Sequence, residues 1–158
     1  MRGKAAPKRK INPDSKYQLV EVAKFINYIM RKGKKTVATK IFYDSLENIF
    51  KKTKKDPIDI FKLAIKNVSP LVEVKSRRIG GANYQIPIPT QPSRRFILAS
   101  RWIIDAAKAK KGKKMSEKLA EELIEAAGGQ GNAIKKRTTF IARRKPIKLL
   151  LTLPDTNV

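Results

Sequence analysis

Apolar residues recur at the three- and four-residue spacing of an amphipathic helix in five segments of this chain, and the stretch between residues 72 and 88 breaks that period. There, apolar and polar residues alternate on both sides of Gly80 and Gly81. Such alternation is typical of a two-stranded hairpin, and the prolines at positions 87, 89 and 92 then oppose further strand pairing. The sequence therefore predicts a mainly α fold, a bundle of five to six helices with one protruding β-hairpin.

The five helical segments are expected at residues 15–31, 36–52, 57–68, 93–110 and 116–127. Ser15 followed by Gln18 fits a capping box. Asp56 before a proline predicts an N-cap, and Ser116 is a candidate N-cap for the last of these helices. The expected core face of the first helix comprises Leu19, Val22, Ala23, Ile26 and Met30. That of the second comprises Ala38, Ile41, Phe42, Leu46, Ile49 and Phe50.

The chain carries far more positive than negative charge. Its 158 residues include 37 Lys and Arg against 13 Asp and Glu, a formal net charge of +24. This charge destabilises a compact chain unless a polyanion screens it, whereas a 41% share of hydrophobic residues is typical of a folded domain. The sequence has no apolar run near the ~18 residues of a membrane span and no signal-peptide pattern. We therefore expect nucleic acid as the partner, and no membrane.

Cysteine and histidine are both absent from the sequence. Disulfides, thiol nucleophiles, the usual zinc ligands and histidine-based acid–base catalysis are thereby excluded. Asp44 and Glu47 lie three residues apart on one helical face, but the sequence offers no third ligand nearby, so a carboxylate-dependent metal nuclease is the competing interpretation. A DNA-architectural protein is a third. We expect no catalytic residue, no metal and no cofactor.

The basic residues are not spread evenly, and three regions are rich in them but nearly free of acids. Residues 1–10 and residues 31–40 each carry five and no acid, and residues 66–101 carry seven with a single acid, Glu73. Forked cations at Arg77 and Arg78 stand beside a glycine turn and the ring of Tyr84, a combination that RNA recognition uses. The alternative is that this charge only solubilises a sheet edge.

The segment from Lys32 to Thr36 superficially resembles a phosphate-binding loop. The first glycine of the Walker pattern would fall at Tyr28, and no strand precedes it, so an NTP site is not expected. Instead, Lys34 and Lys35 at a helix N-terminus are expected to hold backbone phosphates.

Four of the acids gather on the helix expected at 116–127, namely Glu117, Glu121, Glu122 and Glu125. We interpret them as a solvated face. The alternative is a face that meets another basic protein or that turns away from RNA.

Three stretches resemble the family of the seventh protein of the small ribosomal subunit in its bacterial form. These are residues 25–46, residues 98–104, and the hairpin stretch Val74-Lys-Ser-Arg-Arg-Ile-Gly-Gly-Ala-Asn-Tyr-Gln-Ile-Pro87, which is the most specific. The resemblance covers residues 7–137. It implies a six-helix bundle with a β-ribbon, and a structural protein that binds the 3′ major domain of small-subunit rRNA and nucleates assembly of the subunit head.

The resemblance also implies where the protein contacts its partners. It places these residues at the rRNA: Arg2, Lys4, Lys8, Arg9, Lys10, Lys32, Lys34, Lys35, Lys75, Arg77, Arg78, Arg94, Arg95 and Arg101. It places Gly80, Gly81, Ala82, Asn83 and Tyr84 near the E-site tRNA and the mRNA exit path. Ribosomal proteins nine, eleven and thirteen of the small subunit are the implied neighbours, in a bacterial-type cytoplasmic ribosome rather than an organellar one.

The C-terminal residues depart from the family. We expect a basic flexible arm at 1–13, a single rRNA-binding domain at 14–137 with its hairpin at 72–88, and an atypical tail at 138–158. Pro146 would cost a helix ~3 kcal/mol. Family codons for Glu-Ala-Asn-Lys-Ala-Phe-Ala-His, translated one base later, give residues 145–152 of this chain. This predicts a frameshift between about Arg137 and Ile141 and loss of the family's later contacts; a divergent tail is the alternative.

Overall fold

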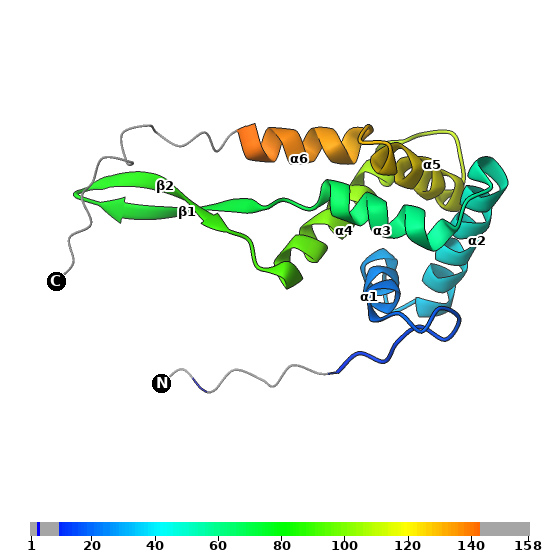
Figure 1. Cartoon of the computed structure of the whole chain (residues 1–158). Helices are drawn as coiled ribbons and strands as arrows, with labels where there is room; N and C mark the ends of the chain where they lie inside the picture. The colour runs from blue at the N-terminus through cyan, green and yellow to red at the C-terminus, as the bar shows by residue number, and fades with distance from the viewer. Residues whose placement is uncertain (1–2, 4–9, 143–158) are drawn as a thin grey trace.

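The computed structural model describes residue 3 and residues 10–142, and within them the mainly α fold with one hairpin is confirmed. Its elements are α1 (Val20–Ile29), α2 (Lys35–Thr53), α3 (Pro57–Val68), β1 (Val72–Ile79), β2 (Ala82–Pro89), α4 (Pro92–Ala109), α5 (Met115–Ala127) and α6 (Asn132–Ala142). Figure 1 shows the helices gathered at one end and the ribbon of β1 and β2 projecting from them. None of the described helices is both long and apolar enough to cross a membrane.

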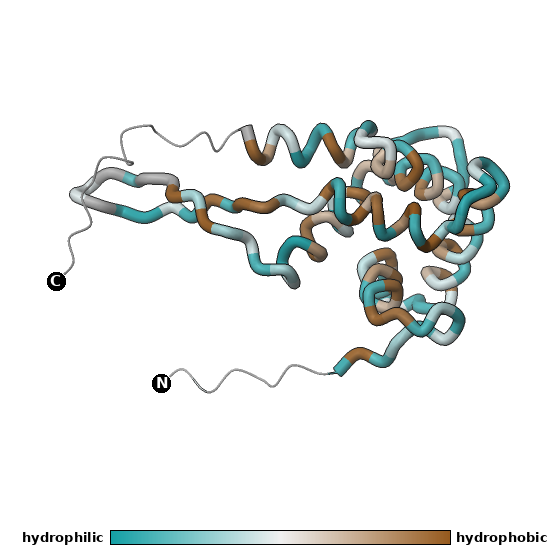
Figure 2. The backbone as a smooth tube through the Cα atoms, in the orientation of Figure 1, coloured by the Kyte–Doolittle hydropathy of each residue, from teal (hydrophilic) through white to brown (hydrophobic). Residues whose placement is uncertain are grey.

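The core is built around α5, which packs against α2, α3 and α4. At its centre three phenylalanine rings from three helices touch: the Phe25 ring lies 5.6 Å from that of Phe42 and 5.0 Å from that of Phe61, and the latter two are 5.6 Å apart. All three side chains are buried. Figure 2 shows the corresponding apolar segments on the helices and at the root of the ribbon. The core therefore fixes the helices relative to one another and leaves the ribbon outside.

The expected core face of α2 is wrong at one position. Phe50 is 57% exposed, whereas its neighbour Ile49 is fully buried. Successive helical residues are turned by about 100° from each other, and Ile49 continues the buried row of Phe42 and Leu46. On α1, too, the buried face differs from the expected one, because it includes Phe25 and Ile29, which are not among the expected core residues. The helical period predicted these two helices, but it did not determine which residues at the edges of their apolar faces are buried.

The first helix starts later than expected. Residues 15–17 form a turn, Gln18 has a φ of +54°, and α1 begins at Val20. The Asp14 carboxylate accepts hydrogen bonds from the backbone amides of Lys16 and Tyr17, both at 3.2 Å, and from the Tyr43 hydroxyl at 2.9 Å. The expected capping box of Ser15 and Gln18 is wrong, because an Asx-type turn held by α2 takes its place.

The expected caps of two later helices have different outcomes. Asp56 is the N-cap of α3, as predicted: its carboxylate accepts a hydrogen bond from the Ile58 amide at 2.9 Å, and Pro57 is the first helical residue. Ser116 is not an N-cap, because α5 already begins at Met115 and its N-cap residue, Lys114, provides no side-chain hydrogen bond. A serine in the first turn of a helix, such as Ser116, is therefore easily mistaken for the N-cap.

This pair of positions gives a stability prediction. Asp56→Ala is expected to lower the free energy of unfolding by about 1 kcal/mol, since it leaves an amide of the first turn of α3 without its acceptor. Ser116→Ala is the matched control and is expected to change it by less than about 0.5 kcal/mol. Urea denaturation followed by circular dichroism measures both. Equal losses in the two variants would contradict the assignment of the caps.

The ribbon pairs β1 and β2 in antiparallel register, from Val72 opposite Pro89 to Ile79 opposite Ala82. Gly80 and Gly81 have φ values of +56° and +88°, the left-handed pair that a tight hairpin turn of type I′ requires. The strand continues through both prolines of β2, beyond the expected end at residue 88. In a two-stranded sheet both strands are edges, where proline is tolerated.

Candidate nucleic-acid interface

The structure places the expected rRNA-facing residues in separate parts of the molecule. Four residues of the basic arm, Arg2, Lys4, Lys8 and Arg9, lie outside the described residues. Lys10 is exposed, as are Lys32 and Lys34 in the loop between α1 and α2 and Lys35 at the start of α2. In Figure 1 the segment before α1 and the ribbon leave the helical body toward the same side of the view.

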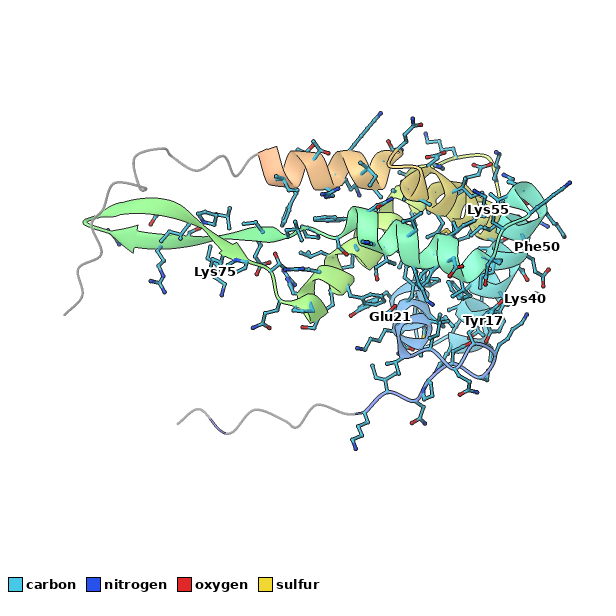
Figure 3. The ribbon with its side chains drawn as sticks, viewed as in Figure 1. Tyr17, Glu21, Lys40, Phe50, Lys55 and Lys75 are labelled. Atoms are coloured by element: carbon cyan, nitrogen blue, oxygen red, sulfur yellow. The ribbon has the colours of Figure 1, made fainter. Side chains whose placement is uncertain are left out.

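The ribbon carries its cations on both faces. Side chains alternate along a strand, so Lys75 and Arg77 share one face and Arg78 lies on the other, with Val74 and Ser76. All three cations are exposed, and none takes part in an ion pair within the described residues. Figure 3 shows Lys75 projecting from the ribbon. Cations on opposite faces can contact one partner together only if that partner surrounds the ribbon.

The cations at the start of α4 are partly used within the protein. Arg94 Nε lies 3.4 Å from Glu73 Oε2, and Arg95 Nε donates a hydrogen bond to the carbonyl oxygen of Thr90 at 2.8 Å. These contacts tie α4 to the root of the ribbon. Arg101 is exposed on the same helix. Arg94 and Arg101 are exposed and remain predicted rRNA contacts, whereas Arg95 is half-buried and has a structural contact.

A groove of about 920 Å³ separates the root of the ribbon from α4 and α6. Its lining includes Val74, Ser76, Trp102, Asp105, Lys135 and Phe140. The rings of Trp102 and Phe140 meet edge to face with centroids 4.8 Å apart, so α6 is held against α4. The groove therefore brings an apolar wall together with the basic side of α6, and α6 continues past residue 137 to Ala142.

The cations of α6 were missed by the sequence analysis. Lys135 and Lys136 line the groove, and Lys136 lies 3.9 Å from Asp105. Arg137 instead turns inward and donates a hydrogen bond to the carbonyl oxygen of Asn67 at 2.8 Å. The run Lys-Lys-Arg after the glycine-rich turn was the signal that could have identified them.

The interpretation of the acidic helix as a solvated face is wrong for Glu122, which is fully buried in α5. Its Oε1 accepts a hydrogen bond from the Ala133 amide in the first turn of α6 at 2.8 Å, and its Oε2 lies 3.2 Å from Lys110 Nζ. Glu125 contacts the same ammonium at 2.8 Å. Burial by itself lowers the pKa of Lys110, but the carboxylates of Glu125 and Glu122 outweigh it and raise that pKa above its ordinary value.

A second cluster of charges links α2 to α5. Glu121 accepts contacts from Lys113 and, at 3.3 Å, from Lys52. The hydrogen bond from Lys113, helped by that from Lys52, lowers the pKa of the Glu121 carboxyl. Three of the four acids of this helix thus have cationic partners within the protein, so they offer little free acidic surface to a second protein.

The carboxylates of the competing metal interpretation lie among cations. Asp44 and Glu47 line a hollow on α2 that also contains Lys16, Lys35 and Lys40. In residue 3 and residues 10–142, no group of three or more Asp, Glu, His or Cys side chains is placed to hold a metal ion. This hollow mixes both signs of charge and has no metal-ligand geometry.

Comparison with known proteins gives one family. The profile of the family described as ribosomal protein S7p/S5e matches residues 1–141. Small ribosomal subunit protein uS7 of Polynucleobacter asymbioticus is 54% identical over 136 residues, which cover 86% of this chain and 87% of that protein. The proteins of the same name from Nitrosospira multiformis and Cupriavidus metallidurans are 54% and 55% identical over 136 residues. The matched region contains the ribbon, the loop before α2 and nearly all of α6.

Proposed function

The chain belongs to the ribosomal protein S7p/S5e family and is a structural constituent of the small ribosomal subunit, and on that premise we propose that it binds the 3′ major domain of the rRNA directly and nucleates assembly of the subunit head. It performs no catalysis in this proposal. Binding rests on phosphate contacts and on the shape of the RNA. The residues proposed to carry it are those named above on the basic arm, the loop before α2, the ribbon and the start of α4.

The observation that carries this proposal is the placement of cations on both faces of the ribbon, none of them ion-paired with a described residue. A two-stranded ribbon alone is marginally stable in water, and this one extends from the core with no third strand paired to it in the part of the chain that the structure describes. Lys75 and Arg77 on one face and Arg78 on the other suit insertion between two RNA segments. A ribbon that only lay along a surface would use one face.

The tip of the ribbon is proposed to approach the E-site tRNA and the mRNA exit path. Gly80 and Gly81 turn the chain there without side chains, so a nucleic-acid backbone can come close to the peptide groups of residues 80–84. Ribosomal proteins nine, eleven and thirteen are the proposed neighbours. The proposed location is the cytoplasmic ribosome of a bacterial-type cell, which the bacterial relatives support.

Filter binding to the 3′ major domain tests the ribbon. Arg77→Ala and Arg78→Ala are each expected to weaken binding roughly tenfold, since one charge-assisted hydrogen bond contributes about 1.5–3 kcal/mol. The slope of log affinity against log salt should fall by about one for each arginine removed. Lys75→Ala should act in the same direction. None of these changes should unfold the helices, because the ribbon lies outside the core.

Lys55→Ala is the matched control for Lys75→Ala. Both lysines are exposed, and Figure 3 shows Lys75 on the ribbon and Lys55 on the side of the helical body away from it. The control should bind rRNA as the wild type does. Unchanged affinity of the Arg77 and Arg78 variants would reject the ribbon as an RNA contact. Equal affinity of the wild type for duplex DNA of the same length would favour a DNA-architectural protein instead.

We also propose that residues 1–13 form the basic arm and that the frame changes between about Arg137 and Ile141. The family match ends at residue 141, which supports a change of sequence near that point. Most of the expected tail, residues 143–158, lies outside the described residues. Sequencing the 3′ end of the gene tests the frameshift. A second frame that does not encode Ala-Asn-Lys-Ala-Phe would reject it.

A further inference from the structure

Four helix ends meet around a hollow of about 350 Å³. The end of α1, the start of α2, the end of α4 and the start of α5 all contribute to it. Its apolar lining comprises Ile29, Val37, Ala38, Ile41 and Met115. Val37 and Ile41 lie one turn apart on α2, so they present one continuous apolar strip. Val37 is part of this lining and is nevertheless 52% exposed, which leaves an apolar surface open to solvent.

Three cations stand around the same hollow, namely Arg31, Lys34 and Lys108. All three are exposed, and none forms an ion pair with any described carboxylate. By contrast, the groove beside the ribbon contains Asp105, and the hollow on α2 contains Asp44 and Glu47. The start of α2 adds to the positive potential, since its first turn has no acidic residue to balance the helix dipole. The hollow therefore combines an apolar floor with uncompensated positive charge.

We propose that this hollow, here called the helix-end socket, receives one unstacked nucleobase of the rRNA, while Arg31, Lys34 and Lys108 bind the phosphates on either side of that nucleotide. The inference rests on the proposed function and names a point of contact within it. Nucleotides outside a helix are recognised in this way, because their bases can leave the stack and pack on side chains, including the flat face of an arginine. Phosphates alone would not require the apolar floor.

Size and charge favour a nucleotide over a peptide. An amphipathic helix binds through anchors spread over two turns, at positions i, i+3, i+4 and i+7, and so needs an elongated groove. A hollow of about 350 Å³ is at the small end of ligand sites and accommodates one ring system. Its rim is also continuous with the loop that holds Lys32 and with Lys35 at the start of α2, which belong to the proposed rRNA surface.

Val37→Ser tests the socket without changing any charge. Valine and serine have similar helix propensity, and the Val37 side chain is half exposed, so the fold should persist. The variant is expected to bind the 3′ major domain at least about fivefold more weakly, with an unchanged salt slope. Lys108→Gln should instead lower the salt slope by about one. Chemical probing with dimethyl sulfate should show one unpaired base that is protected by the wild type and reactive with Val37→Ser.

Leu63→Ser is the matched control, because Leu63 is 46% exposed on α3 and does not line the socket. It should bind as the wild type does, with the full protection pattern. Wild-type affinity and protections in Val37→Ser, with circular dichroism confirming both folds, would overturn the socket alone. A wild type without preference for this rRNA would overturn the proposed function and the socket together.

Discussion

Replacement of Phe42 by alanine is expected to lower the free energy of unfolding by about 3 to 5 kcal/mol. The Phe42 ring is fully buried and touches the rings of Phe25 and Phe61, so its removal leaves a cavity between three helices that cannot easily close. Domains of this kind have about 5–15 kcal/mol of stability in total. The loss should therefore be visible as a large shift of the midpoint of urea denaturation, followed by circular dichroism.

Phe50→Ala is the control for this variant. It removes the same group from the same helix, but the Phe50 side chain is 57% exposed. We expect it to lower stability by less than about 1 kcal/mol. Comparable losses at the two positions would contradict the placement of the core. A wild-type midpoint for Phe42→Ala would contradict it more directly.

Glu122→Ala is expected to lower the free energy of unfolding by about 3 kcal/mol. The change leaves the Ala133 amide without its acceptor and removes one of the two carboxylates that neutralise the partly buried Lys110. Removal of one partner from a buried pair typically costs about 3–5 kcal/mol, and Glu125 is expected to keep the cost at the low end. Gly131, with a φ of +95°, lets the chain turn so that α6 starts at this carboxylate.

Two measurements separate this role from an ordinary surface charge. Glu125→Ala removes a carboxylate that is 43% exposed and should lower stability by less than about 1 kcal/mol. Hydrogen exchange should speed up in α6 of the Glu122 variant, because the first turn of that helix loses its fixed end. If the two glutamate variants behave alike in both measurements, Glu122 does not anchor α6.

Much of the fold could be predicted from periodicity. The helices predicted from periodicity occur where apolar residues recur every three or four positions, and the hairpin occurs where they alternate. Asp56 before Pro57 identified the start of α3, because an N-cap residue and a proline at the first helical position occur together there. The start of α1 could not be predicted, since it depends on a hydrogen bond from Tyr43 to Asp14, 29 residues away. The exposure of Phe50 depends likewise on which helices pack against α2.

The candidate interface divides in the same way. Exposed cations on the loop and the ribbon could be predicted, because glycine turns and a short sheet keep them at the surface. The burial of Glu122 could not, since it depends on where α6 begins relative to α5. The sequence also could not predict that Lys108 lines the same hollow as Arg31 and Lys34, because the helix ends come together only once the helices have packed.

The ribbon and the helical body are joined, but few interactions contribute to the stability of both. The strands pair mainly with each other, whereas the phenylalanine core and the Glu122 contacts lie wholly among the helices. Changes far apart and without shared partners add independently. Beyond the root, where Glu73 contacts Arg94, residues of the ribbon can therefore be exchanged during evolution, and the affinity for a nucleic acid changed, without a penalty in the stability of the helical body.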